Sequence, residues 1–232
     1  LLIQANSTIT ENLLNGLTNK YNIWASTLDK QDVEIMHDRI KNGANLLEDH
    51  VFQFDFLNDD FSKLPMPLQN IINDPDKRKK IVMYINPPYA EAGNTKQKSG
   101  TGTNKSNTSI ENKTYLKYKD KIGKASNEIS AQFLIRIFFE ITDSIIANFS
   151  KLKSLQSSNF NEFRKIFDPK LERLFLVQAN TFDNVKGQFP IGFFIWNSKT
   201  KESFNQIFAD VFNKNGDIIC QKNICNYDKN NS

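Results

Sequence analysis

Apolar residues along this chain occur in two patterns, as short continuous runs and as longer stretches with helical spacing. Short apolar runs predict buried strands, and apolar residues that recur every three or four positions predict amphipathic helices. The predicted strands are residues 22–27, 51–57, 81–85, 144–149, 174–177 and 192–196. The predicted helices are residues 11–17, 31–41, 125–141 and 160–167. This alternation of strands and helices indicates an α/β domain with a mostly parallel sheet.

Composition sets broad limits on this picture. A chain of 232 residues suits a single domain with a sizeable core, and a net charge of +4 is compatible with a polyanionic partner. Two cysteines close together, Cys220 and Cys225, do not make a disulfide framework or a zinc site, so we expect no metal and a reducing, cytoplasmic setting. With no apolar run of about 18 residues and no signal-peptide pattern, we expect no membrane association.

The most informative motif is Asn86-Pro87-Pro88-Tyr89, which directly follows the apolar run 81–85. Two prolines end a strand abruptly, and the carboxyl end of a strand in an open α/β sheet is where ligands bind. The side-chain carbonyl of Asn86 and the backbone carbonyl of Pro87 can accept hydrogen bonds from an exocyclic amino group. This would make the amine more nucleophilic and stabilise the positive charge that develops on attack. Tyr89 offers a flat face for a base rotated out of a duplex. A simple strand-ending turn is the alternative.

Asn-Pro-Pro-Tyr in this setting resembles the catalytic motif of amino-group methyltransferases that use S-adenosylmethionine, above all the DNA adenine-N6 enzymes of bacterial restriction-modification systems. The resemblance covers about residues 11 to 196. It implies a three-layer, Rossmann-like α/β methyltransferase fold with a mostly parallel sheet and an antiparallel hairpin at one edge. It also implies that Asn86, Pro87, Pro88 and Tyr89 are catalytic and that S-adenosylmethionine is the cofactor. The implied partner is double-stranded DNA with a flipped adenine, together with a restriction or specificity domain or subunit.

The resemblance also implies cofactor-binding residues. In the family, a carboxylate after the strand corresponding to residues 22–27 accepts hydrogen bonds from the ribose hydroxyls, a role that falls to Asp29. Thr27 lies nearer the usual position, and Asp29 could instead cap the following helix. After the next predicted strand, Asp55 would face the adenine amino group of the cofactor and Phe56 would pack on its ring. A turn-capping Asp beside a core Phe is the alternative.

Substrate contacts are implied in two further segments. In the family, the connection between the last two strands reaches the active site and packs an aromatic side chain against the target base. Phe182 and Phe189 are the candidates for that wall, and Lys186 is a candidate phosphate contact, with core or turn packing as the alternative. Residues 91–112 are rich in small polar residues and predict a mobile loop that orders over substrate. An ordinary disordered insertion explains the same composition.

The chain departs from the family pattern at the cofactor loop. That loop normally carries an acidic residue and a Gly-x-Gly turn that lets the backbone approach the ligand, but residues 5–14 contain no glycine pair. We therefore expect residues 1–232 to form one methyltransferase domain, incomplete at its N-terminus, with weak or absent cofactor binding by this chain alone. Two other functions stay open: methylation of RNA or protein glutamine by the same fold, and a non-catalytic DNA-binding fragment or subunit.

Overall fold

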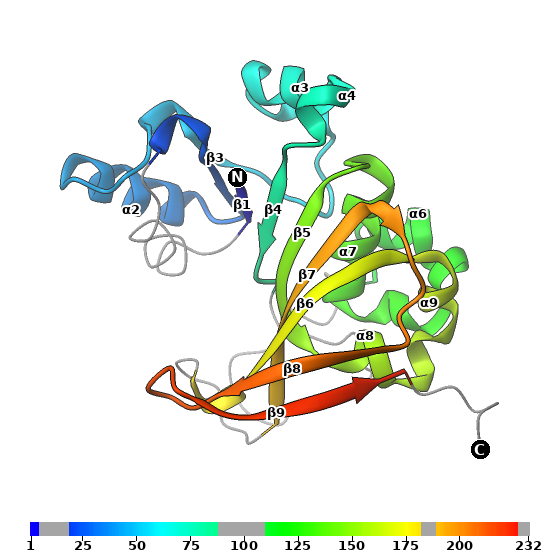
Figure 1. The fold of residues 1–232 in the computed structure, drawn as a ribbon. Helices are drawn as coiled ribbons and strands as arrows, with labels where there is room; N and C mark the ends of the chain where they lie inside the picture. Colours follow the sequence, from blue (N-terminus) through cyan, green and yellow to red (C-terminus); the bar gives the residue numbers. More distant parts are fainter. Residues whose placement is uncertain (5–18, 88–109, 182–188, 227–232) are drawn as a thin grey trace, which may run out of the picture.

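The computed structural model of the chain describes residues 1–4, 19–87, 110–181 and 189–226. Within these residues a nine-stranded sheet has the strand order β3-β2-β1-β4-β5-β7-β6-β8-β9 (Figure 1). The strands are β1 (Leu2–Gln4), β2 (Trp24–Thr27), β3 (Val51–Gln53), β4 (Val82–Ile85), β5 (Ile145–Lys151), β6 (Pro169–Gln178), β7 (Pro190–Lys201), β8 (Gln206–Phe212) and β9 (Ile218–Cys225).

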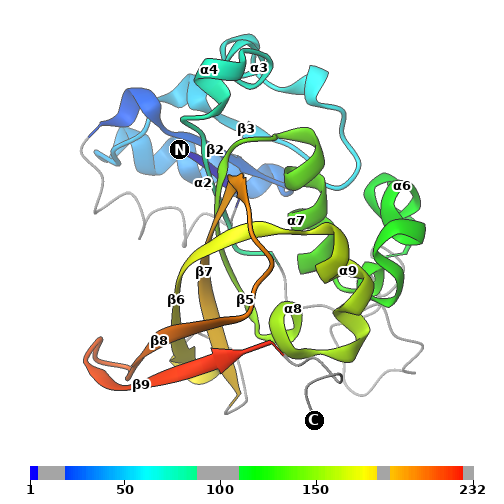
Figure 2. The ribbon, with the colours of Figure 1, turned by 45° about the vertical axis from the view of Figure 1, so that its right-hand side comes forward.

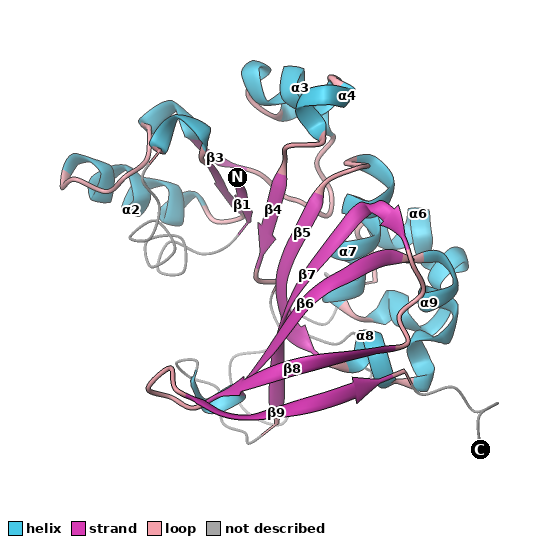
Figure 3. Ribbon diagram, in the orientation of Figure 1, coloured by secondary structure: helices cyan, strands magenta, loops and turns pink. Residues whose placement is uncertain are grey.

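Helices connect most of these strands, as the colouring in Figure 3 shows. The α-helices are α2 (Lys30–Lys41), α3 (Met66–Asn73), α4 (Pro75–Arg78), α6 (Lys113–Ile122), α7 (Ile129–Glu140), α8 (Lys153–Gln156) and α9 (Asn161–Ile166). The short 3-10 helices are η1 (Lys20–Asn22), η2 (Glu48–His50), η3 (Phe61–Lys63), η4 (Gly123–Asn127), η5 (Ser158–Phe160) and η6 (Ala179–Thr181). In the described residues, no helix combines the length and hydropathy needed to cross a bilayer.

The sheet is mixed, with a parallel half and a largely antiparallel half. β1 pairs in parallel with β2 and β4, and the parallel pairing continues outward to β3 and β5. β7 is antiparallel to β5 and β6, β8 is parallel to β6, and β9 is antiparallel to β8. The prediction of an α/β fold with a mixed sheet is confirmed. The prediction that the last hairpin forms the edge is wrong, because β8 and β9 continue the sheet beyond β6.

Both faces of the sheet carry apolar clusters, because side chains alternate between the faces along each strand. Met83, Ile85 and Ile146 belong to the larger cluster, which includes the apolar sides of α6, α7, α8 and α9. Ile3, Tyr84 and other side chains of opposite parity form the smaller cluster with Met36 of α2. In Figure 1, α7 and α9 lie behind β5, β6 and β7. Figure 2 shows the same helices to the right of these strands.

Several predicted boundaries shift. Predicted strand 51–57 ends early, at Gln53, because the Asp55 carboxylate accepts hydrogen bonds from two following backbone N–H groups and closes a turn. Predicted helix 125–141 is α7, which begins at Ile129 after the 3-10 helix η4. Predicted helix 160–167 is α9, which buries Phe163 as expected.

Candidate functional site at the carboxyl ends of the parallel strands

The carboxyl ends of β1, β2, β3 and β4 lie at one edge of the sheet. Gln4 of β1 is in register with Ile85 of β4 and with Ser26 of β2, whose hydroxyl donates to the Gln4 side-chain oxygen. From β1 and β4 the chain order runs outward in opposite directions, to β2 and β3 on one side and to β5 on the other. In open α/β sheets, ligands bind outside the strand ends at such a reversal.

Asn86 stands at this reversal. It directly follows Ile85, and its backbone N–H donates to the Gln4 carbonyl oxygen at 3.2 Å. Asn86 is half-buried and Pro87 is buried. Pro88 and Tyr89 lie outside the described residues, so their catalytic roles stay predictions.

The end of β2 carries the first two predicted cofactor residues. Thr27 is buried, and its hydroxyl donates to Asp32 Oδ2 at 3.3 Å. Asp29 is exposed and caps α2, because its Oδ1 accepts a hydrogen bond from the Gln31 N–H at 2.9 Å. Sequence analysis did not single out Asp32, although an acidic residue in the first turn of a helix is a recognisable signal.

The turn after β3 carries the other two predicted cofactor residues, Asp55 and Phe56. Asp55 Oδ1 accepts hydrogen bonds from the Leu57 and Asn58 N–H groups at 3.0 and 3.1 Å, and Oδ2 accepts one from Asn58 Nδ2 at 2.8 Å. Phe56 is 3% exposed and stacks on Phe133 of α7 with a centroid separation of 4.9 Å. The carboxylate thus shapes the turn, and the Phe56 ring is largely covered by protein.

A buried arginine that sequence analysis missed fixes this turn to α7. Arg136 is 6% exposed; it donates to the carbonyl oxygen of Phe56 and, at 2.6 Å, to that of Asp59. Its Nε donates to Glu140 at 3.0 Å, and its guanidinium carbon lies 4.5 Å from the Phe61 ring centroid. The available signal was one basic residue inside the apolar run of residues 133–139.

The N-terminus of α6 contacts the same turn. Thr114 Oγ1 donates to the Leu57 carbonyl oxygen at 2.8 Å. Asn112 is buried; it caps α6 by accepting from the Tyr115 N–H at 2.8 Å, and its Nδ2 donates to Gln132 at 2.9 Å. The predicted mobile loop 91–112 lies outside the described residues as far as residue 109. Its last residue, Asn112, is held in place, so the loop interpretation does not apply there.

Glu140 completes the network of Arg136. Its Oε1 accepts hydrogen bonds from Lys117 Nζ and the Tyr118 hydroxyl, both at 2.8 Å. Burial disfavours the ionised carboxylate, but the hydrogen bonds from Lys117 and Tyr118, together with the charge of Arg136, outweigh it and hold the pKa of Glu140 below its usual value. Burial, followed by the contact with Glu140, raises the pKa of Tyr118 to about 12.

The start of β7 lies at the same edge of the sheet, because Pro190 and Ile191 stand beside the end of β5. Phe189 is half-buried, and the centroid of its ring is 5.3 Å from Lys151 Nζ. Phe182 and Lys186 lie outside the described residues. Of the three predicted substrate contacts, only Phe189 is placed at the edge.

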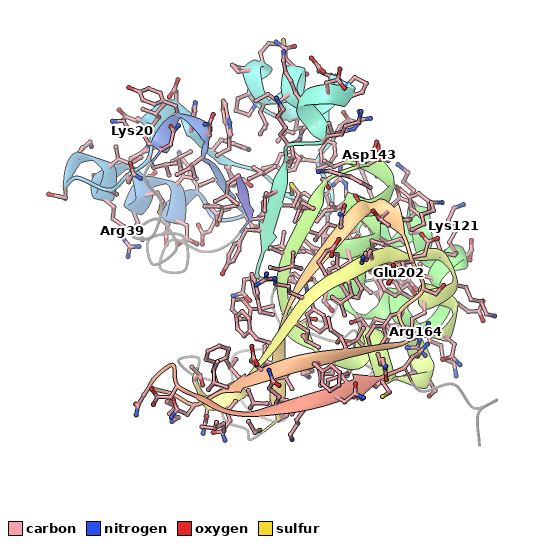
Figure 4. All side chains as sticks on the ribbon, viewed as in Figure 1. Lys20, Arg39, Lys121, Asp143, Arg164 and Glu202 are labelled. Atoms are coloured by element: carbon pink, nitrogen blue, oxygen red, sulfur yellow. The ribbon has the colours of Figure 1, made fainter. Side chains whose placement is uncertain are left out.

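One cavity lies at the carboxyl end of β5, and a second lies against α9 and β7. The first, of about 450 Å³, is lined by Lys151, Phe189 and neighbouring residues. The other, of about 520 Å³, lies between α9 and the segment after β7; Arg164 and Glu202, both labelled in Figure 4, line it. None of the predicted site residues that the structure describes lines the second cavity. In the described ranges, no cluster of three His, Cys, Asp or Glu side chains is placed to hold a metal ion.

Neither a protein-family model nor a curated protein sequence matches this chain. Solved structures do match its fold. The cryo-electron microscopy structure of the DrdV–DNA complex has a TM-score of 0.61 at 15% identity over 90% of this chain and 24% of that chain. A nuclease-deletion mutant of the type ISP restriction-modification enzyme LlaGI, in complex with a DNA substrate mimic, has a TM-score of 0.58 at 12% identity over 99% of this chain and 27% of that one.

A third match is the methyltransferase subunit of a type I restriction-modification system from Streptococcus thermophilus. Its TM-score is 0.52 at 15% identity, over 90% of this chain and 42% of that subunit. The chain therefore spans less than half the length of each of these three proteins. At such identities the similarity establishes the fold, which this chain shares with part of a restriction-modification methyltransferase subunit.

Proposed function

We propose that this chain is the methyltransferase domain of a restriction-modification system and transfers a methyl group from S-adenosylmethionine to adenine N6 in double-stranded DNA. The observation that carries the proposal is the position of Asn86 and Pro87, directly after β4 where the chain order reverses. We take residues 1–232 as one three-layer, Rossmann-like domain, which the apolar clusters on both faces of the sheet support. Its setting is the cytoplasm, with a restriction or specificity partner.

The chemistry requires two acceptors for one amino group. The Asn86 side-chain oxygen and the Pro87 carbonyl oxygen accept hydrogen bonds from the adenine amino group, and the fixed φ of proline holds the second acceptor in place. Both acceptors stabilise the positive charge that the nitrogen gains, and the amino proton leaves to solvent after transfer. Tyr89 stacks on the flipped base. When bound, S-adenosylmethionine supplies the electrophilic methyl group.

The cofactor roles rest on the order of the strand ends. Thr27 and Asp29 at the end of β2, and Asp55 after β3, lie on the opposite side of β1 from Asn86. A ligand that extends along these ends can present its ribose to Asp29 and its adenine to Asp55, since carboxylate oxygens accept hydrogen bonds from hydroxyl and amino groups. Phe56, at 3% exposure and stacked on Phe133, leaves little ring surface for the adenine.

Transfer of labelled methyl groups into duplex DNA tests the proposal. Asn86→Ala removes one acceptor, and we expect the rate of transfer to fall by about 10²-fold to 10³-fold. Asn73→Ala, at an exposed asparagine at the end of α3, is the matched control and should keep the wild-type rate. Nuclease digestion should recover the label as N6-methyladenine. Equal rates for Asn86→Ala and wild type, or label in RNA or protein instead of DNA, would contradict the proposal.

A non-catalytic DNA-binding subunit is the second candidate. It is favoured by the absence of a glycine pair in residues 5–14. Calorimetry with S-adenosylmethionine separates the two functions. Binding that weakens on Asp55→Ala supports the enzyme, and no heat at millimolar ligand supports the non-catalytic subunit.

A further inference from the structure

A groove of about 450 Å³ opens at the carboxyl end of β5. We call it the β5 groove; it is lined by Lys151, Leu152, Lys153, Gln156, Ser157, Phe189 and Pro190. Lys151 is the last residue of β5 and pairs with Ile191 of β7, so the groove lies between that strand end, the start of α8 and residues Phe189 and Pro190. In Figure 2, α8 lies beside the end of β5.

The β5 groove is next to the catalytic turn. Ile85 of β4 is in register with Asn148 of β5, so the same register brings Asn86 level with Phe149. Lys151 is two residues further along β5, a rise of about 7 Å. The distance is on the scale of one nucleotide, so a base at Asn86 places the sugar and phosphate of its own or a neighbouring nucleotide at this groove.

The chemistry of the lining suits an anion. Its seven residues include two lysines and no acidic side chain. Lys153 forms an ion pair with Glu128, which does not line the groove, with Nζ and Oε1 2.6 Å apart. The ammonium group of Lys151 lies over the Phe189 ring at 5.3 Å, a cation–π contact that orients it at the groove wall. Gln156, which is exposed, adds neutral hydrogen-bond donors.

We propose that the β5 groove binds a backbone phosphate of the DNA strand whose base is presented to Asn86, with Lys151 as the residue that positions this phosphate. The inference rests on the proposed function, since it takes DNA as the substrate. An ammonium group at a phosphate releases condensed counterions, and this contributes affinity without reading the sequence. The ring of Phe189 then lies beside the backbone, where it can stack on a neighbouring base.

Fluorescence anisotropy with a labelled duplex over a series of salt concentrations tests this assignment. Each phosphate contact contributes about 0.9 to the slope of the logarithm of affinity against the logarithm of salt concentration. Losing one contact therefore lowers this slope by about 0.9 and, at about 0.1 M salt, weakens binding about eight-fold. We expect Lys151→Gln to show both changes. Lys151→Arg keeps the charge and should keep the slope. Lys199→Gln, at an exposed lysine near the other end of β7, makes the same charge change and serves as the control.

The outcomes separate the two levels of inference. If wild type binds and Lys151→Gln behaves like Lys199→Gln, the phosphate assignment is overturned while DNA binding stands. If wild type shows no duplex binding even at low salt, the proposed function fails and the assignment fails with it. If wild type and all variants bind RNA of the same sequence more tightly than DNA, the assignment of DNA as the bound nucleic acid is wrong. Matching thermal unfolding of Lys151→Gln and wild type ensures that the affinity change reports on contact rather than folding.

Discussion

At the residue scale, an arginine that no motif identifies fixes the turn after β3 to α7. Arg136 satisfies the carbonyl oxygens of Phe56 and Asp59, which belong to a turn that is about eighty positions away in sequence. These groups would otherwise lack partners in a buried setting, where an unpaired polar group is costly. Sequence periodicity reports the apolar side of α7 correctly, but it cannot report a contact over such a separation. Asn86 was singled out because its motif is contiguous in the sequence, and its catalytic role stays a prediction.

Acid stability is expected to depend on Glu140. Its pKa is held below the usual value of 4.5 in the folded state, so its ionisation stabilises the fold above that pH, and the contribution is lost as pH falls through the folded pKa. Glu140→Gln should therefore flatten the decline of Tm between neutral pH and about pH 3. Thermal unfolding followed by circular dichroism at a series of pH values measures this. Parallel curves for Glu140→Gln and wild type would show that the carboxylate is not linked to folding.

At the element scale, continuous apolar runs predicted β4, β5, β6 and β7, and the structure confirms them. The strands that the sequence pattern did not predict lack such apolar runs. β1 has only three residues, and all but one of the residues of β9 are exposed, so neither produces a periodic signal. β3 was predicted too long because Phe54 and Phe56 continue the apolar pattern into the turn. Strand pairing, which a local pattern does not encode, decides these cases.

Gly192 in β7 is expected to tolerate no side chain. A Cβ there would lie 2.7 Å from Phe194 Cε2 and 3.0 Å from Leu174 Cδ1, and the Phe194 ring is fully buried. Gly192→Ala should lower the free energy of unfolding by about 2 kcal/mol, since overpacking forces neighbours from their preferred positions. Urea unfolding measures the change, with Thr200→Ala at an exposed position of β7 as the control. A stability equal to that of the control would show that the ring moves aside freely.

At the scale of the whole molecule, the two apolar clusters hold the strands whose ends make the site. Each cluster contains a buried tyrosine: Tyr84 belongs to the smaller one and Tyr118 to the larger. The mostly parallel arrangement of the first strands was expected from the resemblance to a known fold, and the strand order puts Asn86 at the carboxyl edge of that half of the sheet. The extension of the sheet beyond β6 was not expected, because that part of the chain mixes polar and apolar residues without a clear period.

Alkaline titration is expected to report on this packing. Burial raises the pKa of Tyr84 to about 12, and burial with the Glu140 contact raises that of Tyr118 to about 12. A raised pKa for an acid means that the neutral form stabilises the fold below the unfolded value of 10.0, and that this stability is lost as pH rises through the folded value. Near-ultraviolet titration should show two phenols that ionise near pH 10 in urea but resist ionisation there in buffer. Identical curves in both solvents would contradict the burial.

The outermost position of β9 has a consequence for handling the protein. The strand ends the sheet, and Ile218 and Ile219 at its start are 59% and 56% exposed, so its outward backbone groups form a template on which another chain can add. Lys222, near the middle of the strand, opposes this by repelling a second copy aligned at the same point. Neutralising Lys222 would therefore leave this edge of the sheet more open to edge-to-edge pairing with a second copy.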